Sequence, residues 1–237
     1  MKKSFLFLVL ISSVLISATV ITNNCDFEQF TNGATYTMTS YDAKAKVTSS
    51  SYSTVKNVVK TGTGVSADIE TLMKDGKEKD LGSGTISVKC DGDKYSIDMK
   101  SFVSAQMNQA NKDMTMTFEG NLLEYSAAMT VGQSLPDGNL TVHAANNGSE
   151  FSVTTINIHD RKVEAIESKT TPAGTWECYK ISYIEDVKMK MGGMNIPGMK
   201  PVKVIEWFSF KVGTVRSETY RNEKMEGYNE LTSFKKP

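Results

Sequence analysis

The stretch TISVKCDGDKYSIDM, residues 85–99, decides the fold class. Ile86, Val88 and Cys90 alternate with polar residues, the turn Asp-Gly-Asp follows, and the alternation resumes at Tyr95. A period of two is typical of a half-buried strand. Glycine supplies the positive φ that a tight hairpin turn needs. These residues therefore predict two antiparallel strands joined by a hairpin.

The same alternation recurs along the chain with turn residues between the runs. It covers residues 65–74, 114–119, 140–142, 151–155, 163–170, 175–183, 202–210, 215–220 and 228–234. A short helix is expected at residues 101–111, where Ser101 can cap the first turn. The pattern predicts an all-β fold, an antiparallel curved sheet or incomplete β-barrel of about a dozen strands with at most one or two short helices.

The N-terminus has the three parts of a secretory signal peptide, residues 1–18. Lys2 and Lys3 precede an apolar run at residues 5–16, and Ala18 follows as the small residue at the cleavage site. The run is shorter than the ~20 residues that span a bilayer, so no transmembrane anchor is expected after cleavage. Cys25 follows Thr-Asn-Asn, which disfavours a lipid anchor. We expect residues 19–237 to form a single β-rich domain that is periplasmic or secreted.

The composition argues against several functions. The chain has 27 basic and 27 acidic residues, so no nucleic-acid partner is expected. The two histidines, His143 and His159, fall in expected strands, and Asp160 should point to the opposite face from His159. We therefore expect no catalytic residues, no cofactor and a non-enzymatic protein.

Three cysteines, Cys25, Cys90 and Cys178, leave the disulfide pattern open. In an oxidising compartment two of them can pair and one stays free, and the sequence does not select among the three pairings. The alternative is three unpaired, buried thiols. Cys178 lies in an apolar aromatic run, which raises the pKa of a thiol rather than activating it.

A methionine-rich segment, KMKMGGMNIPGM at residues 188–199, contains Met189, Met191, Met194 and Met199. We interpret it as a flexible apolar loop that covers the open side of the sheet, because methionine adapts to irregular surfaces. The alternative is a soft-metal site, because clustered thioethers select Cu(I). No histidine or cysteine joins the cluster, and we therefore prefer the loop and assign no metal ligands.

Several motifs in the C-terminal half resemble a known family. They are TPAGTWECYKI at residues 171–181, EWF at 206–208 and VGTVRSE at 212–218, with LEY at 123–125 and LPDG at 135–138 in the middle. Together they resemble the TapB-like periplasmic proteins of unknown function, although Lys211 stands where that family has glycine. The resemblance implies a curved antiparallel sheet similar to the half-barrel lipoprotein carriers, with no activity to transfer. Trp176 and Trp207 in these motifs are candidates for packing residues or ligand contacts.

Three functions remain, in order of preference. The first is a binding protein for an apolar or lipid-like ligand, held in a half-barrel with the methionine segment as a lid. The second is a structural or protein-interaction module of the envelope. The third is a soft-metal-binding protein. An apolar cavity of about 300 Å³ or more would favour the first over the second.

Overall fold

The computed structural model describes residues 25, 27, 30–62, 64–92, 94–98, 114–197 and 200–237. The expected signal peptide, the expected helix at residues 101–111 and Met199 lie outside the described residues. Within the described part of the chain every regular element is a strand, and no helix there could cross a membrane.

The strands follow one another with short connections. They are β1 Thr35–Asp42, β2 Val47–Thr61, β3 Gly64–Asp75, β4 Asp80–Asp91, β5 Lys94–Asp98, β6 Met114–Gly120, β7 Leu122–Ser126, β8 Gly138–Asn146, β9 Ser149–Thr171, β10 Gly174–Met191, β11 Met194–Ile196, β12 Val202–Ser209, β13 Gly213–Arg221 and β14 Lys224–Lys235.

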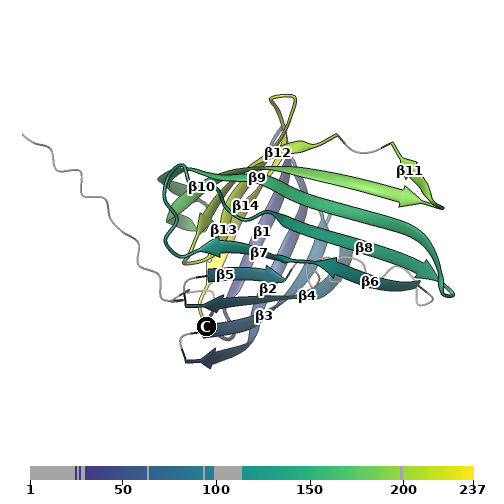
Figure 1. Ribbon diagram of the computed structural model, residues 1–237. Coiled ribbons are helices and arrows are strands. Elements are labelled where there is room, and N and C mark those ends of the chain that lie inside the picture. The colour runs from purple at the N-terminus through teal and green to yellow at the C-terminus, as the bar shows by residue number, and fades with distance from the viewer. Residues whose placement is uncertain are drawn as a thin grey trace, which may run out of the picture.

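All fourteen strands form one antiparallel sheet, in the order β6-β8-β9-β10-β12-β13-β14-β1-β2-β3-β4-β5-β7, with β11 paired to β10. The sheet curls around an interior (Figure 1). The predicted hairpin is present as β4 and β5, with Cys90 opposite Tyr95 and Gly92 at φ 63°. The predicted fold class, an open and curved all-β sheet, is confirmed.

The two ends of the sheet meet where one stretch of chain changes partners. β6 pairs with β8, whereas β7 pairs with β5, and Asn121 alone separates β6 from β7. The side chain of Asn121 bonds the backbone N–H of Asn139 at 2.7 Å and the carbonyl of Asp137 at 3.0 Å. A Cβ at Gly120 would collide with the carbonyl oxygen of Asn139, so glycine permits this approach. We call this junction the seam.

Aromatic side chains fill the closed end of the interior. Tyr125 stacks on Phe208 with ring centroids 4.1 Å apart, and Phe27 stacks on Tyr95 at 5.0 Å. Phe210 meets Phe208 edge to face at 5.1 Å. Offset and edge-to-face pairs of this kind add stability beyond the area they bury.

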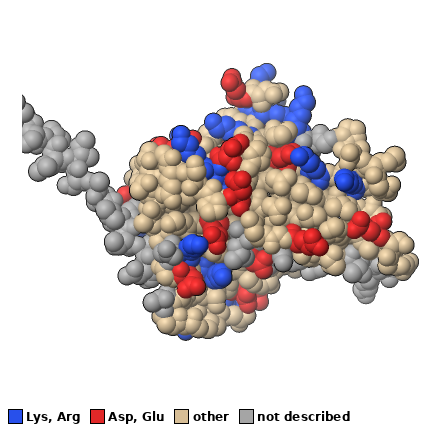
Figure 2. Space-filling model, in the orientation of Figure 1, with Lys and Arg blue, Asp and Glu red and all other residues tan. Residues whose placement is uncertain are grey.

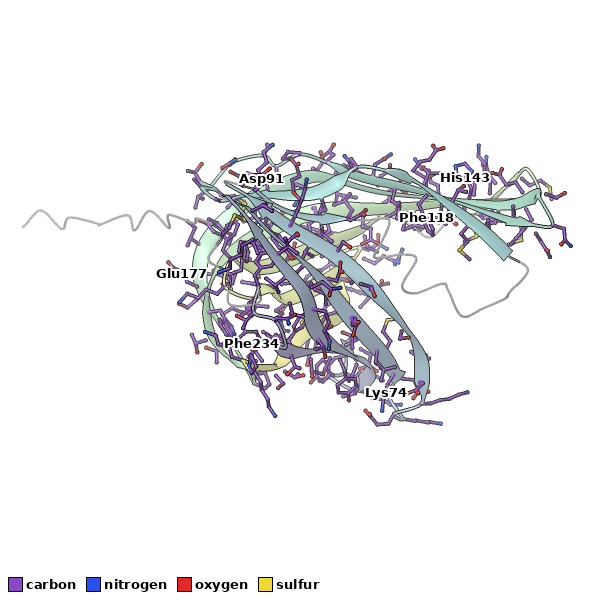
Figure 3. The ribbon with its side chains drawn as sticks, turned by 90° about the horizontal axis from the view of Figure 1, so that it is seen from below. Lys74, Asp91, Phe118, His143, Glu177 and Phe234 are labelled. Carbon is purple, nitrogen blue, oxygen red and sulfur yellow. A yellow bond between two sulfur atoms is a disulfide. The ribbon has the colours of Figure 1, made fainter. Side chains whose placement is uncertain are left out.

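Away from that end the sheet divides into two arms (Figure 3). The β3–β4 arm, residues 67–87, ends near Lys74, and the β9–β10 arm, residues 114–120, 138–158 and 184–196, carries Phe118 and His143. The two arms diverge from each other in this view (Figure 3).

Candidate ligand-binding cavity

A cavity of about 510 Å³ lies on the inner face of the sheet, along β1 to β5 and the β12–β13 turn. Cross-strand partners share a face of a sheet. Ser51 faces the cavity together with its partners Met38 on β1 and Met73 on β3. The pairing register therefore decides which residues line the cavity.

One wall of the cavity is polar. Ser40 donates a 2.6 Å hydrogen bond to the amide oxygen of Asn229, whose nitrogen donates to Ser217 at 3.0 Å. Ser49 and Ser51 have no side-chain hydrogen bond to any other described residue. The polar lining residues are Ser40, Ser49, Ser50, Ser51, Ser53, Thr71, Thr214, Ser217 and Asn229.

The remaining lining is apolar or aromatic. Ile69 and Ile86 lie opposite each other on β3 and β4, and Leu81 at 52% exposure marks the rim. This part consists of Tyr36, Met38, Ile69, Met73, Leu81, Ile86, Val88, Tyr95, Ile97 and Val212, besides two glycines. Burial raises the pKa of Tyr36 to about 12, so its hydroxyl stays neutral. Among the described residues that line the cavity, none has a charged side chain.

A buried carboxyl lies directly behind the cavity wall. Thr214, which lines the cavity, donates a 2.6 Å hydrogen bond to Glu206 Oε1, and Tyr125 donates to Oε2 at 3.0 Å. Glu206 is 3% exposed. Burial raises the pKa of this carboxyl, against the opposing effects of the Thr214 hydrogen bond, the Arg161 charge and the Tyr125 hydrogen bond.

Arg161 is a buried cation, 2% exposed. It contacts the ring of Tyr125, whose hydroxyl bonds Glu206. Its Nη1 donates to the carbonyls of Glu124 at 2.9 Å and Pro136 at 2.6 Å, and its guanidinium lies 4.9 Å from the ring centre of Tyr125. Its Nε and Nη2 have no hydrogen-bond partner among the described residues. Arg161 therefore joins β9 to β7 across the seam.

Sequence reasoning missed both buried charges, and only Glu206 leaves a signal in the sequence. In β12, Glu206 lies two residues after Val204 and two before Phe208, so all three share the buried, mostly apolar face of the strand. The position of Arg161 could not be inferred from alternation, because a bulge interrupts the strand there. Asp160 adopts φ 55°, and the pairing between β9 and β10 shifts at this point. A charged residue at an alternate position of an otherwise apolar strand face is the pattern that could reveal Glu206.

Neither predicted tryptophan lines the cavity. Trp207 is 5% exposed and donates a 2.6 Å hydrogen bond from Nε1 to Glu167, while the ammonium of Lys169 lies 3.7 Å from the centre of its ring. Trp176 packs edge to face against Phe234 at 5.9 Å. The motif tryptophans therefore pack within the sheet and do not reach the cavity.

The methionine segment differs from the expected loop. Met189 and Met191 belong to β10, which pairs with β9 up to Met191, and Met194 belongs to β11. The two glycines make a hairpin turn instead of a loose loop, because both adopt positive φ. None of these three methionines is among the residues that line the cavity, and the expected lid stays a prediction.

Of the three possible pairings, the structure contains the disulfide Cys25–Cys90. A sulfur atom in a disulfide cannot also carry a thioether-linked lipid. Cys178 is free and buried, and burial raises the pKa of its thiol to about 12. A thiol in this state is a poor nucleophile.

Both histidines contact carboxylates at the surface. His143 Nδ1 lies 2.7 Å from Glu150, and His159 Nδ1 lies 3.0 Å from Asp160. The second contact corrects the expectation that these neighbours point apart, because the bulge at Asp160 turns its side chain.

In the part of the chain that is described, no group of three or more His, Cys, Asp or Glu side chains could hold a metal ion. Figure 2 shows acidic and basic side chains interspersed on one face.

A curved, open antiparallel sheet with an internal cavity defines the architectural class. The chain belongs to the DUF3108-like family, whose profile matches residues 31–231. The uncharacterised family expected from the motifs is thus supported, while the TapB-like name is not confirmed. No curated protein matches the sequence.

Two crystal structures share the fold. A protein from Bacteroides fragilis NCTC 9343, described as exported and with a YmcC-like fold, is 26% identical, with a TM-score of 0.68 over 86% of this chain and 96% of that one. A protein from Parabacteroides distasonis ATCC 8503, described as a lipoprotein, is 22% identical, with a TM-score of 0.69 over 88% of this chain and 97% of that one. The second likeness shows the fold alone.

Proposed function

We propose that this protein is a non-enzymatic envelope protein that binds a neutral, amphipathic, lipid-like molecule in the cavity. The observation that carries the proposal is the division of one 510 Å³ cavity into a hydroxyl-rich wall and an apolar wall. Small-molecule sites of ~300–1,000 Å³ commonly combine an apolar lining with a few polar groups that orient the ligand.

The lining chemistry narrows the class of ligand. Ile69, Ile86 and Ile97 offer apolar surface for a hydrocarbon chain. Ser49 and Ser51 offer hydroxyls that are not engaged by other described side chains and that can donate to or accept from an ester, amide or hydroxyl group. Because the described lining residues are all uncharged, they offer a charged headgroup no partner to compensate for its lost hydration. A neutral headgroup fits better.

Three features support a location outside the cytoplasm. The N-terminal sequence has the pattern of a signal peptide. The Cys25–Cys90 disulfide persists in oxidising compartments. The Bacteroides fragilis neighbour, 26% identical, is described as an exported protein. We place the protein in the periplasm or among secreted proteins.

The alternative is an interaction module of the envelope, and one observation favours it. β5 pairs with β4 from Val88 to Asp91, so residues 80–86 of β4 have no strand on that side within the described residues. An uncovered strand edge can pair with an extended segment of another protein.

Native mass spectrometry of protein purified from its own envelope separates these functions. The proposal expects a bound mass that organic solvent releases as a neutral lipid-like molecule. Protein that carries no ligand from that source, and that also fails to bind a neutral lipid added in excess, would contradict it and leave the interaction module ahead.

A further inference from the structure

The methionine hairpin brings thioethers together on one face, which the sequence alone does not establish. Met191 lies directly opposite Met194 across the Gly192–Gly193 turn, and Met189 lies opposite Ile196. The two glycines have φ of 56° and 80°, as a two-residue hairpin turn requires. Residues two apart on a strand, and cross-strand partners, share a face. Met189, Met191 and Met194 therefore project from the same side of the hairpin.

The spacing of these side chains suits a common ligand. Directly opposed residues have Cβ atoms ~4.5–5.5 Å apart. Met189 lies two residues along the strand from Met191, which is roughly 6.5 Å at ~3.3 Å per residue. The methionine side chain is long and unbranched, with three rotatable bonds, so three sulfur atoms at these positions can converge on one ion.

The surroundings leave this face accessible. Met191 is 47% exposed and Met194 is 72% exposed, so neither belongs to a packed core. Lys188 and Lys190 alternate with the methionines and therefore point to the other face. The charge of Lys188 is also offset by Asp186, 3.0 Å from its ammonium.

We propose that Met189, Met191 and Met194 form a binding site for a soft monovalent cation, Cu(I) or its analogue Ag(I). Thioether sulfur is a soft ligand that selects Cu(I) over hard divalent ions. This site is separate from the cavity, whose lining contains none of the three residues. It stands or falls independently of the proposed lipid-like ligand.

The ligand type makes the site distinguishable from a cysteine or histidine site. Thiols and imidazoles must lose a proton to bind a metal, so their affinity falls as the pH falls. A thioether carries no proton, and the affinity of this site for Ag(I) is therefore expected to change little between pH of about 5 and about 8. The buried thiol of Cys178, with its raised pKa, would show the opposite behaviour.

The test is a titration of the full mature protein with Ag(I), which needs no reductant and leaves the disulfide intact. The decisive variant is Met189→Leu/Met191→Leu/Met194→Leu, because leucine keeps the apolar surface and removes only the sulfur. Met225→Leu on β14 is the matched control. Carbon-13 methyl resonances of the methionines report which sulfurs bind.

The proposal expects one equivalent of Ag(I) to bind wild type and Met225→Leu alike, with shifts confined to the three hairpin methyl groups. The triple variant should lose that equivalent while its unfolding transition is unchanged. If the triple variant binds Ag(I) as wild type does, or if the affinity follows thiol ionisation with pH, the proposal is wrong.

Discussion

Arg161 Nη1 donates a 2.9 Å hydrogen bond to the backbone carbonyl of Glu124 and so ties β9 to β7. No ladder of backbone hydrogen bonds pairs these two strands in the described part of the chain. The second bond of the same nitrogen, to Pro136, holds the segment that leads into β8. One buried side chain therefore links β7, β9 and the segment before β8 at the seam.

We expect Arg161→Met to lower the free energy of unfolding by about 2 kcal/mol, because two partly buried carbonyls lose a charged donor. Removal of the unpaired Nε and Nη2 offsets part of the loss. Urea denaturation measures the change. Arg221→Met is the control, since Arg221 also donates to a backbone carbonyl, that of Lys200, but on the surface. Equal losses in both variants would show that the seam has no special dependence on Arg161.

Glu206 should make folding stability depend on pH. Burial raises the pKa of this carboxyl in the folded state, so folding favours the protonated form. Its contribution is full below the pKa of the unfolded chain and is lost as the pH rises through the folded pKa. Glu206→Gln imitates the protonated form. We therefore expect the variant to gain thermal stability relative to wild type at pH of about 8, and to gain less at pH of about 5.

Thermal unfolding of both proteins in the same buffers measures this difference. A gain that is equal at the two pH values would mean that Glu206 does not titrate differently on folding. A larger gain at the acidic pH would mean that the pKa of Glu206 is lowered in the folded state.

The disulfide should contribute substantially to stability. It joins residues 65 apart in sequence, and closure of a loop of this size corresponds to roughly 4 kcal/mol in the chain-entropy account. Cys25→Ser/Cys90→Ser should unfold at correspondingly lower urea concentration. Wild-type protein treated with a reductant under denaturing conditions and refolded without reoxidation should match it. A stability unchanged by both treatments would contradict the pairing.

The expected strands and the Asp-Gly hairpin are predictable from the sequence because the alternation of apolar and polar residues with a period of two is a local pattern. Residues 35–61 yield no expected strand, although they form β1 and β2. In β2 the serines Ser49, Ser51 and Ser53 face inward, and Tyr52 is 38% exposed on the outer face. A polar cavity wall inverts the usual rule that apolar residues face inward, so hydropathy alone misreads such a strand.

The arrangement of the candidate site depends on contacts between distant strands, which local patterns do not contain. Glu206 on β12 meets Tyr125 on β7 because the sheet curls, and these residues are 81 apart in sequence. The register between β10 and β11 likewise decides which methionines share a face. The glycines of the methionine segment suggested a loop. Glycine also supplies the positive φ that a hairpin turn needs, so the same residues fit the observed hairpin.

A matched pair of serine variants tests whether the cavity binds a neutral lipid-like ligand. Ser51→Phe places a ring in the cavity, whereas Ser66→Phe places the same ring on the exposed outer face of β3. Binding of the neutral fluorescent probe N-phenyl-1-naphthylamine is measured for both and for wild type. We expect saturable binding by wild type and Ser66→Phe, and an affinity at least about tenfold weaker for Ser51→Phe, a loss of ~1.4 kcal/mol. Equal binding by a folded Ser51→Phe would contradict it.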